Sequence, residues 1–220
     1  MNMITLKKVA LGIALTATVV AAKAQKVYTE GSINYNINAN GMDVAAKCYF
    51  KTDTSSIEFA QGPANIKMIG TAKNDYFVVL VSVPVASMKK AAVATPGEIE
   101  EAGDAEPSYA FTATAETKKI GDYNCKKYTA KDIKSNATYD LWLTTDIKVP
   151  ANTMTKAFAS LSGTPVSFTF LRSMGGKSYP QTVTLTSISD AKVPAGTFSV
   201  PADYDKITLT DLQNMGGRKQ

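Results

Sequence analysis

Residues 31–50 read GSINYNINANGMDVAAKCYF, and the order of residue types in this stretch decides the fold class. Apolar residues occupy every second position over residues 33–37, with polar residues between them. A period of two is typical of a β-strand that buries one face. Asn and Gly residues at 38–41 indicate a turn, and the alternation resumes over residues 44–50. The stretch therefore predicts a β-hairpin.

Most of the chain beyond this hairpin has the same strand-like character. Short apolar or alternating segments are separated by Gly, Pro, Asn and Ser, which favour turns. Residues 76–83 are almost continuously apolar and rich in valine, which is typical of a central strand covered on both faces. Further strands are predicted at residues 55–60, 66–69, 109–115, 123–131, 139–145, 166–172, 182–189 and 198–200. We therefore expect about ten strands in an antiparallel arrangement.

Two segments predict short helices among these strands. In residues 154–161, apolar side chains recur at the i, i+3, i+4 and i+7 positions of one helical face. These side chains are Met154, Ala157, Phe158 and Leu161. Gly163 and Pro165 should end this helix. Residues 88–94 predict a second, shorter helix.

Residues 95–107 differ in composition from the strands around them. They contain five carboxylates, framed by Gly and Pro, with Ile99 as the only large apolar residue. This composition predicts a mobile acidic surface loop without packed structure. Carboxylates are also calcium ligands, but their spacing lacks the arrangement of an EF-hand loop, so we expect no metal site. Near the end of the chain, residues 210–220 predict a frayed tail.

The first 24 residues have the three parts of a secretory signal peptide. Lys7 and Lys8 precede a run of 14 mostly apolar residues, and the Ala-Lys-Ala triplet at 22–24 resembles a cleavage signal. The apolar run is too short to span a bilayer, so we expect no membrane-spanning segment. Cleavage after Ala24 would make Gln25 the first residue. We therefore expect an exported protein, periplasmic or else extracellular, without the lipid anchor that an N-terminal cysteine would allow.

Residues 25–220 have the length and composition of a single globular domain. Removing the lysines at positions 7, 8 and 23 lowers the basic count from 24 to 21 against 19 acids, so the net charge falls from +5 to +2. Phosphate recognition needs clustered basic residues. The near-neutral charge of the mature chain therefore argues against a nucleic-acid partner.

The chain contains no histidine, which excludes several classes of enzyme. Ser-His-Asp and Cys-His nucleophiles and histidine general bases cannot form, and common zinc sites lose a main ligand. Carboxylate-based hydrolysis is the remaining alternative, because aspartates at strand ends could assemble into a pair. These aspartates are Asp122, Asp132, Asp140 and Asp146. Scattered acids of this kind are usually solvated, so we expect no enzyme, no catalytic residues and no cofactor.

Cys48 and Cys125 are the two cysteines of the chain and are candidates for a disulfide in an oxidising compartment. Closing the loop between them would contribute roughly 4 kcal/mol in the chain-entropy model. Cys48 shares a predicted strand face with Phe50, whereas Cys125 alternates out of phase with Tyr128. The alternative of two unpaired thiols therefore stays open.

Three segments in the second half are similar to a known family: KIGDYNCKKY at 119–128, LWLTTDI at 141–147 and FSVPADY at 198–204. Their order and spacing resemble those of uncharacterised exported bacterial proteins, a domain of unknown function grouped with the lipoprotein-carrier (LolA-like) superfamily. In that superfamily an aromatic-bearing strand, a helix, a Gly-Pro turn and a closing Phe-x-x-Pro strand follow in the same order. Trp142 would be the strand aromatic here.

The resemblance implies a mainly β fold with minor α content. It implies a strongly curved antiparallel sheet, an unclosed β-barrel, with one or two helices packed on its concave side. In the carriers this concavity holds acyl chains. Such a site needs a wide apolar surface, because an acyl chain cannot hydrogen-bond to buried polar groups. The candidate lining residues are Tyr35, Phe50, Phe77, Phe111, Met154, Phe158, Phe168 and Phe170.

Two functions are consistent with that fold. The first is an exported binding protein that holds a lipid or another hydrophobic small molecule in the concave cavity. The second is a cell-envelope interaction or sensing module, in which the same aromatic residues fill a dry core and the partner is another envelope protein. No position matches the arginine that fixes the helical lid of the carriers, since Arg172 lies near a predicted hairpin tip. The functional residues of the carriers are therefore not transferred to this chain.

Overall fold

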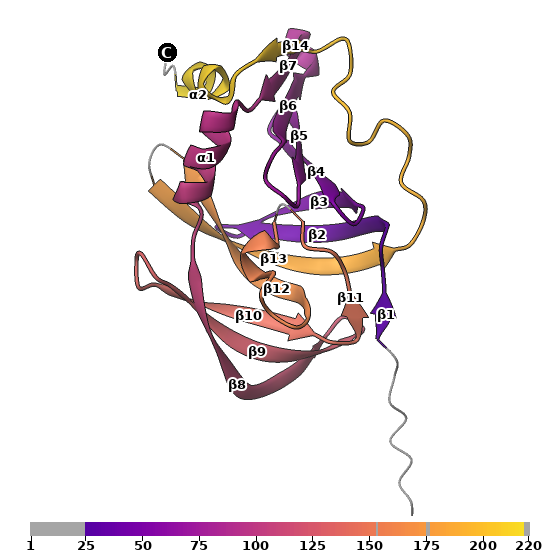
Figure 1. Ribbon diagram of the computed structural model, residues 1–220, viewed down its shortest axis with the longest axis vertical. Helices are drawn as coiled ribbons and strands as arrows, with labels where there is room; N and C mark the ends of the chain where they lie inside the picture. Colours follow the sequence, from indigo (N-terminus) through magenta and orange to yellow (C-terminus); the bar gives the residue numbers. More distant parts are fainter. Residues whose placement is uncertain (1–24, 153, 175–176, 218–220) are drawn as a thin grey trace, which may run out of the picture.

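The protein, described by a computed structural model over residues 25–152, 154–174 and 177–217, is built on one long curved sheet (Figure 1). Twelve strands form this sheet: β2 (Gly31–Ala39), β3 (Met42–Phe50), β4 (Thr54–Gln61), β5 (Ala64–Thr71), β6 (Phe77–Val83), β7 (Met88–Val93), β8 (Tyr109–Ile120), β9 (Tyr123–Asp132), β10 (Thr138–Thr144), β12 (Thr164–Met174), β13 (Lys177–Ser189) and β14 (Asp205–Ile207). Their spatial order is β14-β7-β6-β5-β4-β3-β2-β13-β12-β10-β9-β8. The predicted export signal at 1–24 lies outside the described residues.

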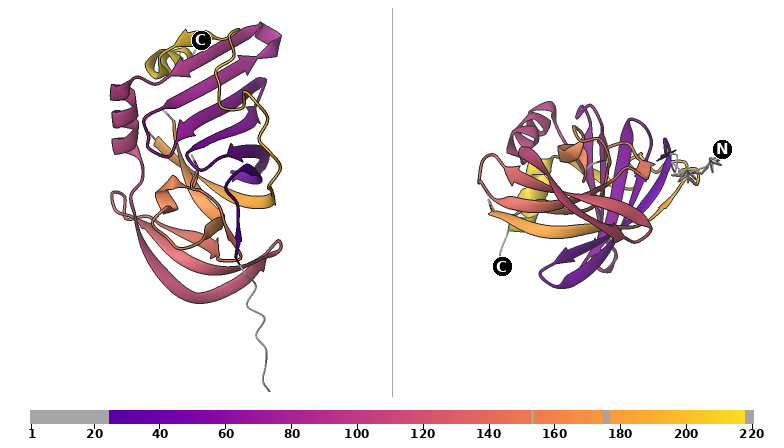
Figure 2. Two further views of the ribbon diagram at one scale, coloured as in Figure 1. Left: turned by 45° about the vertical axis from the view of Figure 1, so that its right-hand side comes forward. Right: turned by 90° about the horizontal axis from the view of Figure 1, so that it is seen from below.

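The sheet consists of two antiparallel runs of strands, which are joined by a single pair of neighbouring strands. β2 to β7 pair with one another in chain order, and β8, β9, β10, β12 and β13 form the second run. β13 then pairs with β2 and joins the two runs (Figure 2). At this junction Asn34 Nδ2 donates a hydrogen bond to Ser187 Oγ at 2.8 Å, across 153 residues of chain. One continuous sheet results.

The hairpin predicted at residues 31–50 is confirmed as β2 and β3. Ile33 lies opposite Cys48 in the register of the two strands, and both side chains are buried. The turn residues Asn40 and Gly41 have φ values of 53° and 84°. Asn and Gly tolerate this left-handed region, which a tight hairpin turn requires at both central positions.

Gly31, at the start of β2, allows a close approach between β2 and β13. A Cβ at this position would lie 2.1 Å from the Ser189 carbonyl oxygen. The atom it would meet belongs to the backbone, so no side-chain rotation could relieve the clash. Only glycine fits here.

The sheet curves strongly but does not close (Figure 2). β8 and β14 are its two edges, and helix α1 (Pro96–Ala105) connects β7 near one edge with β8 at the other. β14 pairs with β7 in parallel, whereas the other neighbours in this sheet are antiparallel. β1 (Lys26–Val27) and β11 (Ile147–Lys148) form a separate parallel pair. The predicted fold class, mainly β with a curved, unclosed and largely antiparallel sheet, is confirmed.

The prediction of a mobile loop at residues 95–107 is wrong, because most of this segment forms α1. Thr95 Oγ1 accepts a hydrogen bond from the Glu98 N–H at 3.3 Å, and the Glu98 carboxylate accepts one from the Thr95 N–H at 2.8 Å. This capping box, with Pro96 at the first helical position, starts the helix. Because the segment contains few apolar residues, its composition indicates a loop, and its capping box is not recognised from composition alone.

The prediction of a frayed tail at 210–220 is also wrong for the described part, which forms helix α2 (Leu209–Gly217). Its first turn is capped reciprocally. The Thr208 N–H donates to Asp211 Oδ2 at 3.1 Å, and the Asp211 N–H donates to Thr208 Oγ1 at 3.0 Å. An aspartate at this position can satisfy the free N–H groups of a helix start.

Glu98 connects the first turns of the two helices. Its Oε1 accepts hydrogen bonds from the Thr210 N–H at 2.8 Å and from Thr210 Oγ1 at 2.7 Å. The hydrogen bond from the Thr95 backbone, with those from Thr210, lowers the pKa of Glu98 from 4.5 to about 2. Donors aimed at a carboxylate favour its charged form.

Two further helix predictions are wrong. Residues 88–93 of the predicted helix at 88–94 form strand β7, which pairs with β6 and β14, so sheet pairing decides their conformation. Residues 154–161 contain a single 3₁₀ turn, η2 (Lys156–Phe158), in place of the predicted helix. Another 3₁₀ turn, η1 (Pro84–Ala86), follows β6.

Residues 198–200 form turn and irregular structure, so the strand predicted there is wrong. They belong instead to a second, smaller hydrophobic cluster. Phe198 and Val200 pack against this cluster, whose buried members are Ile69, Val78, Leu80 and Ala91. The segment after β13 therefore covers the face of β6 that is turned away from the main core.

Cys48 and Cys125 are both free and buried, so the candidate disulfide is not formed and the alternative of two unpaired thiols holds. Cys48 lies on β3 and Cys125 on β9, and four strands separate these two in the sheet. Adjacent strands lie about 4.8 Å apart, whereas a disulfide requires its two Cα atoms within about 7 Å. Burial raises the pKa of Cys48 to about 12.

Candidate functional site: a cavity beneath residues 149–163

Residues 149–163 connect β11 with β12, and their first part is hydrogen-bonded to the interior of the sheet. The Asn152 N–H donates to Thr155 Oγ1 at 3.0 Å, and Asn152 Oδ1 accepts from the Met154 N–H at 2.9 Å. These local hydrogen bonds compete with a regular helix. Asn152 Nδ2 also donates to the Tyr35 hydroxyl of β2 at 3.2 Å. Burial raises the pKa of Tyr35 well above its usual range, so this hydroxyl stays neutral.

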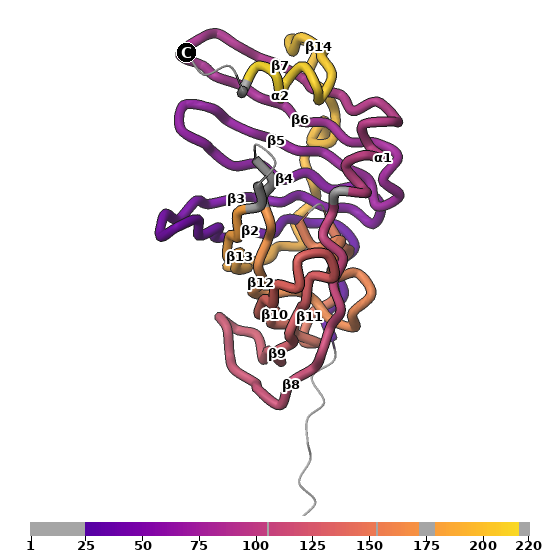
Figure 3. The backbone as a smooth tube through the Cα atoms, turned by 90° about the vertical axis from the view of Figure 1, so that its left-hand side faces the viewer, coloured from indigo at the N-terminus to yellow at the C-terminus, as the bar shows by residue number. Residues whose placement is uncertain are grey.

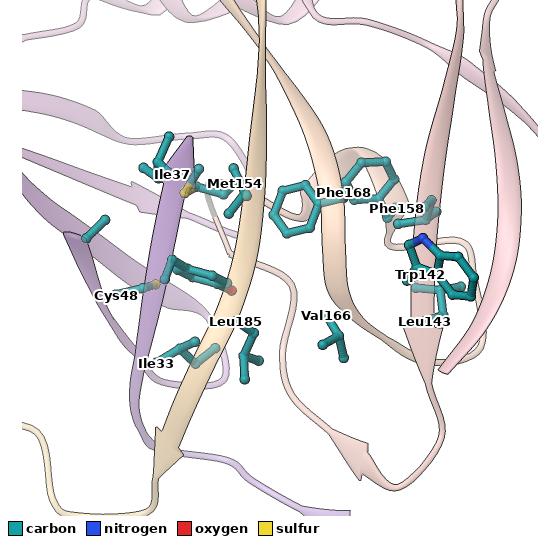
Figure 4. Packing of buried hydrophobic residues seen from close by; sticks show 14 of the residues in the cluster. Ile33, Ile37, Cys48, Trp142, Leu143, Met154, Phe158, Val166, Phe168 and Leu185 are labelled. Atoms are coloured by element: carbon teal, nitrogen blue, oxygen red, sulfur yellow. The ribbon is translucent and has the colours of Figure 1, made fainter. Parts of the chain in front are cut away.

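Phe158, in η2, is the centre of an aromatic cluster, and Figure 4 shows it beside Phe168. Its ring centroid lies 5.3 Å from that of Phe168, 5.8 Å from Tyr109 and 6.1 Å from Phe111. The contacts with Phe168 and Phe111 are edge-on, and the one with Tyr109 is stacked. Both geometries are favourable for aromatic rings. Phe158 therefore fills the part of the concavity in front of β8 and β12.

Lys156 connects the same segment to two other parts of the fold. Its Nζ forms an ion pair with the Glu106 carboxylate, immediately after α1, and donates to Asn74 Oδ1 at 3.3 Å. Asn74 lies in the turn between β5 and β6. Partly exposed ion pairs contribute little stability individually. The two contacts of Lys156 instead help to position residues 149–163 between the two runs of strands.

The structure brings seven of the eight predicted lining residues into one hydrophobic core. Five are buried and two are half-buried at its edge: Tyr35, Phe50, Met154, Phe158 and Phe168, then Phe111 and Phe170. Phe77 is half-buried on β6, opposite Gly70, and lies outside this cluster. The Tyr35 and Phe168 rings meet edge-on at 6.3 Å, so much of the predicted aromatic wall packs against itself.

A cavity of about 590 Å³ lies between residues 149–163 and β2. Tyr35 and Phe158 are the two predicted lining residues that border it. Its apolar surface is extended by Ile33, Val149 and Leu161. The free space is therefore displaced from the centre of the predicted aromatic wall.

Sequence reasoning missed the polar part of this lining. Thr145, Asn152 and Thr155 border the cavity, and Lys148 is the one charged residue among those that line it in the described part of the chain. Gln25 also borders it, and its Nε2 donates to the Thr145 carbonyl at 3.0 Å. These polar residues are scattered over a strand end and irregular segments, where they follow no period, so the sequence offered no pattern by which to find them. The lining thus combines an apolar surface with hydroxyl and amide groups.

Three of the four aspartates considered for catalysis have structural contacts. Asp132 accepts hydrogen bonds within the turn after β9, Asp140 pairs with Lys127 at 3.1 Å, and Asp146 accepts from the Asn124 N–H at 2.8 Å. Within the described ranges, no group of three or more Asp, Glu or Cys side chains could hold a metal ion. No helix in the same ranges is long and apolar enough to cross a membrane.

Residues 29–204 match the model of a family described as a domain of unknown function, DUF4412. No curated protein matches the sequence. Among solved structures, the chain is similar to PNGF-II in space group P21, with 16% identity and a TM-score of 0.51 over 85% of this chain and 33% of PNGF-II. PNGF-II in space group C2 gives a TM-score of 0.49 at 16% identity, over 84% of this chain and 32% of that one. The chain thus spans about one third of PNGF-II, and the likeness concerns the fold alone.

The chain is also similar to a chain of the Pseudomonas aeruginosa MucA/MucB complex. The identity is 9% and the TM-score 0.44, over 82% of this chain and 58% of that chain. This likeness is weaker than the one to PNGF-II.

Proposed function

The chain belongs to the DUF4412 family of domains of unknown function, and from this premise we propose that its exported, mature form binds an amphipathic lipid or another hydrophobic small molecule. The ligand would lie in the cavity between residues 149–163 and β2. The proposed place of action is the periplasm, after removal of residues 1–24. We propose a binding protein and no enzymatic activity.

The cavity of about 590 Å³ is the observation that supports this proposal. Ligand pockets for small molecules usually measure about 300–1,000 Å³ and combine apolar walls with a few polar groups. Ile33, Val149 and Leu161 would contact the hydrocarbon part of the ligand. Thr155 and Lys148 offer donors for a polar or acidic head group.

Displacement of a fluorescent fatty acid from purified residues 25–220 tests the proposal. Native mass spectrometry of the same sample would detect a co-purifying lipid. Ala159, an exposed residue that borders the cavity, is replaced by phenylalanine to fill it. Ala195→Phe is the matched control, because Ala195 is exposed and does not border the cavity. We expect Ala159→Phe to weaken probe binding at least 10-fold and Ala195→Phe to leave it unchanged.

Two outcomes would contradict the proposal. One is protein of apo mass alone, with no saturable binding of the probe. The other is a probe affinity in Ala159→Phe equal to that of the parent. Thermal unfolding of both variants separates loss of binding from loss of folding.

The aromatic contacts of Phe158 favour a second candidate, an envelope interaction module with a dry core. In that case the binding surface would lie outside the sheet, and α1 is the proposed surface. Glu100, Glu101 and Asp104 are exposed on this helix. Replacing these three by Gln, Gln and Asn should then abolish crosslinking to a basic envelope protein, whereas fatty-acid binding would not change.

A further inference from the structure

The segment that begins at Gln25 is fixed along one border of the cavity. Gln25 borders the cavity, and its Nε2 donates hydrogen bonds to the carbonyl oxygens of Thr145 at 3.0 Å and of Ile147 at 3.4 Å. The N–H of the next residue, Lys26, donates to the Asp146 carbonyl at 3.0 Å, within the parallel pair of β1 and β11. Gln25 is therefore held both by its side chain and by its neighbour in the chain, so its backbone nitrogen stays at this border.

Cleavage after Ala24 would change the charge of this border. In a precursor the backbone nitrogen of Gln25 belongs to an uncharged peptide bond. In the mature chain it is an α-amino group, which has an ordinary pKa of about 7.7–8.0 and is largely cationic at pH 7. Lys148 also borders the cavity, is exposed, and forms no ion pair within the described ranges. Two cationic groups would thus lie at one border of the cavity.

Two acids near this border do not line the cavity. Asp190 Oδ2 forms an ion pair with Lys26 Nζ at 2.9 Å. The Asp146 carboxylate accepts hydrogen bonds from the backbone N–H and Nδ2 of Asn124 on β9, at 2.8 and 3.2 Å. No acid is found among the described residues that line the cavity. Because Asp190 neutralises Lys26, the α-amino group and Lys148 leave a net positive charge beside Asp146.

From the fixed position of Gln25 and the acid-free lining, we infer that the ligand of the cavity is a single-chain anionic amphiphile of the fatty-acid class. Its acidic head group is bound by the α-amino group of Gln25 and by Lys148. The inference rests on the proposed function and on cleavage after Ala24. Because cleavage creates the α-amino group, removal of the export signal completes the binding site.

The rest of the cavity fits the remainder of such a ligand. Val149 and Leu161 offer apolar surface to the hydrocarbon chain. A volume of about 590 Å³ lies within the range of pockets that hold one small molecule. Hydrogen bonds between an ammonium group and a carboxylate are charge-assisted, and they are stronger than those between neutral groups. The acidic head group would therefore be oriented towards Gln25.

Four forms of residues 25–220 test the inference. The first has a free α-amino group, and the second is acetylated there at about pH 6.5, where the α-amino group reacts before the lysines because its pKa is lower. The third is Lys148→Gln. The fourth, Lys206→Gln, is the matched control, since it removes the same charge from an exposed residue of β14 that does not border the cavity. Figure 3 shows β14 at one end of the molecule and β11 in the opposite half. Mass spectrometry of the intact protein and its peptides verifies a single acetyl group on Gln25.

Each form is titrated with a long-chain fatty acid and with its uncharged methyl ester, by displacement of one neutral fluorescent probe. We expect acetylation and Lys148→Gln each to weaken binding of the acid about five-fold, which is the upper end for an ion pair in contact with water. Binding of the ester should not change in either form. Lys206→Gln should leave the affinity for both ligands unchanged.

The failures of the inference and of the proposed function give different results. If the acid and the ester bind equally well to every form, the inference is overturned while the binding function stands. If neither ligand binds to any form, the binding function fails and the inference fails with it. An equal loss of acid and ester binding on acetylation would assign the effect to the structure of the N-terminal segment and would also overturn the inference.

Discussion

Replacing Phe158 by alanine tests whether aromatic packing holds residues 149–163 on the sheet. The side chain is 5% exposed, and three ring centroids lie 5.3 to 6.1 Å from its own. Full burial of such a side chain contributes about 1.5–3 kcal/mol, and each ring pair adds about 0.5–1.5 kcal/mol. Measured Phe-to-Ala costs in protein cores are about 3–5 kcal/mol. We therefore expect a loss of about 4 kcal/mol in the free energy of unfolding.

Urea denaturation followed by the fluorescence of Trp142 measures this loss. Phe158→Leu keeps most of the apolar burial but removes the ring contacts, so it should cost about 1.5 kcal/mol. Phe170→Ala is the control in the same core. Because Phe170 is half-buried at the edge of the cluster, its cost should be well below that of Phe158→Ala. An unchanged urea dependence would show that the whole domain still unfolds in one transition.

A loss below about 1 kcal/mol for Phe158→Ala would refute the packing argument, since that value is typical of a surface side chain. Equal costs for the leucine and alanine variants would refute the role assigned to the rings. The thermal midpoint provides an independent check. A loss of this size should lower it by about 10 °C in a domain of this length.

Three other variants test features of the sheet and helices. Gly31→Ala should cost at least about 3 kcal/mol in thermal or urea unfolding, because its Cβ would lie 2.1 Å from the Ser189 carbonyl oxygen; a near-neutral effect would contradict the close approach. Ser56→Ala should stabilise the fold by about 1 kcal/mol, since the buried Ser56 hydroxyl has no hydrogen-bond partner among the described residues; a loss of stability would indicate a partner. The pKa of Glu98 is lower in the folded protein than in the unfolded chain, so the charged Glu98 carboxylate stabilises the fold. This stabilisation is complete above pH 4.5 and is lost as the pH falls towards 2. The rate of hydrogen exchange in α1 should therefore rise as the pH falls over that interval. Glu98→Gln should remove this pH dependence, and an unchanged profile in that variant would assign it to another group.

The strands could be predicted because one face of each is buried. In β2, Ile33 and Tyr35 are buried while Asn34 is exposed, so burial reproduces the alternation in the sequence. The valine-rich run of β6 lies between pairing neighbours on both sides, as a central strand should. These signals come from short stretches of the chain. They do not predict the pairing of β2 with β13, whose partner residues Asn34 and Ser187 are 153 residues apart.

The failed predictions share a physical cause, because each depended on contacts that composition does not reveal. Glu98 looked like part of a solvated acidic loop, yet its carboxylate caps α1 and binds Thr210 of α2. Phe158 was found as part of a helical stripe, but its environment is an aromatic cluster reached from an irregular segment.

The cavity was the least predictable feature. Asn152 and Thr155 face its interior from an irregular segment, where residues have no fixed period. The expectation of an apolar concave wall identified Tyr35 and Phe158 at its border. The same expectation could not show that the other aromatic side chains would pack against one another and leave little free space beside them.

The junction of β2 with β13 has a consequence for the timing of folding. Each run of strands can form from contacts between neighbours in the chain, but their union needs residues 177–189, which are synthesised late. Bringing ends so distant together costs loop entropy and is slow. A nascent chain on the ribosome therefore cannot complete its sheet before residues 177–189 have emerged.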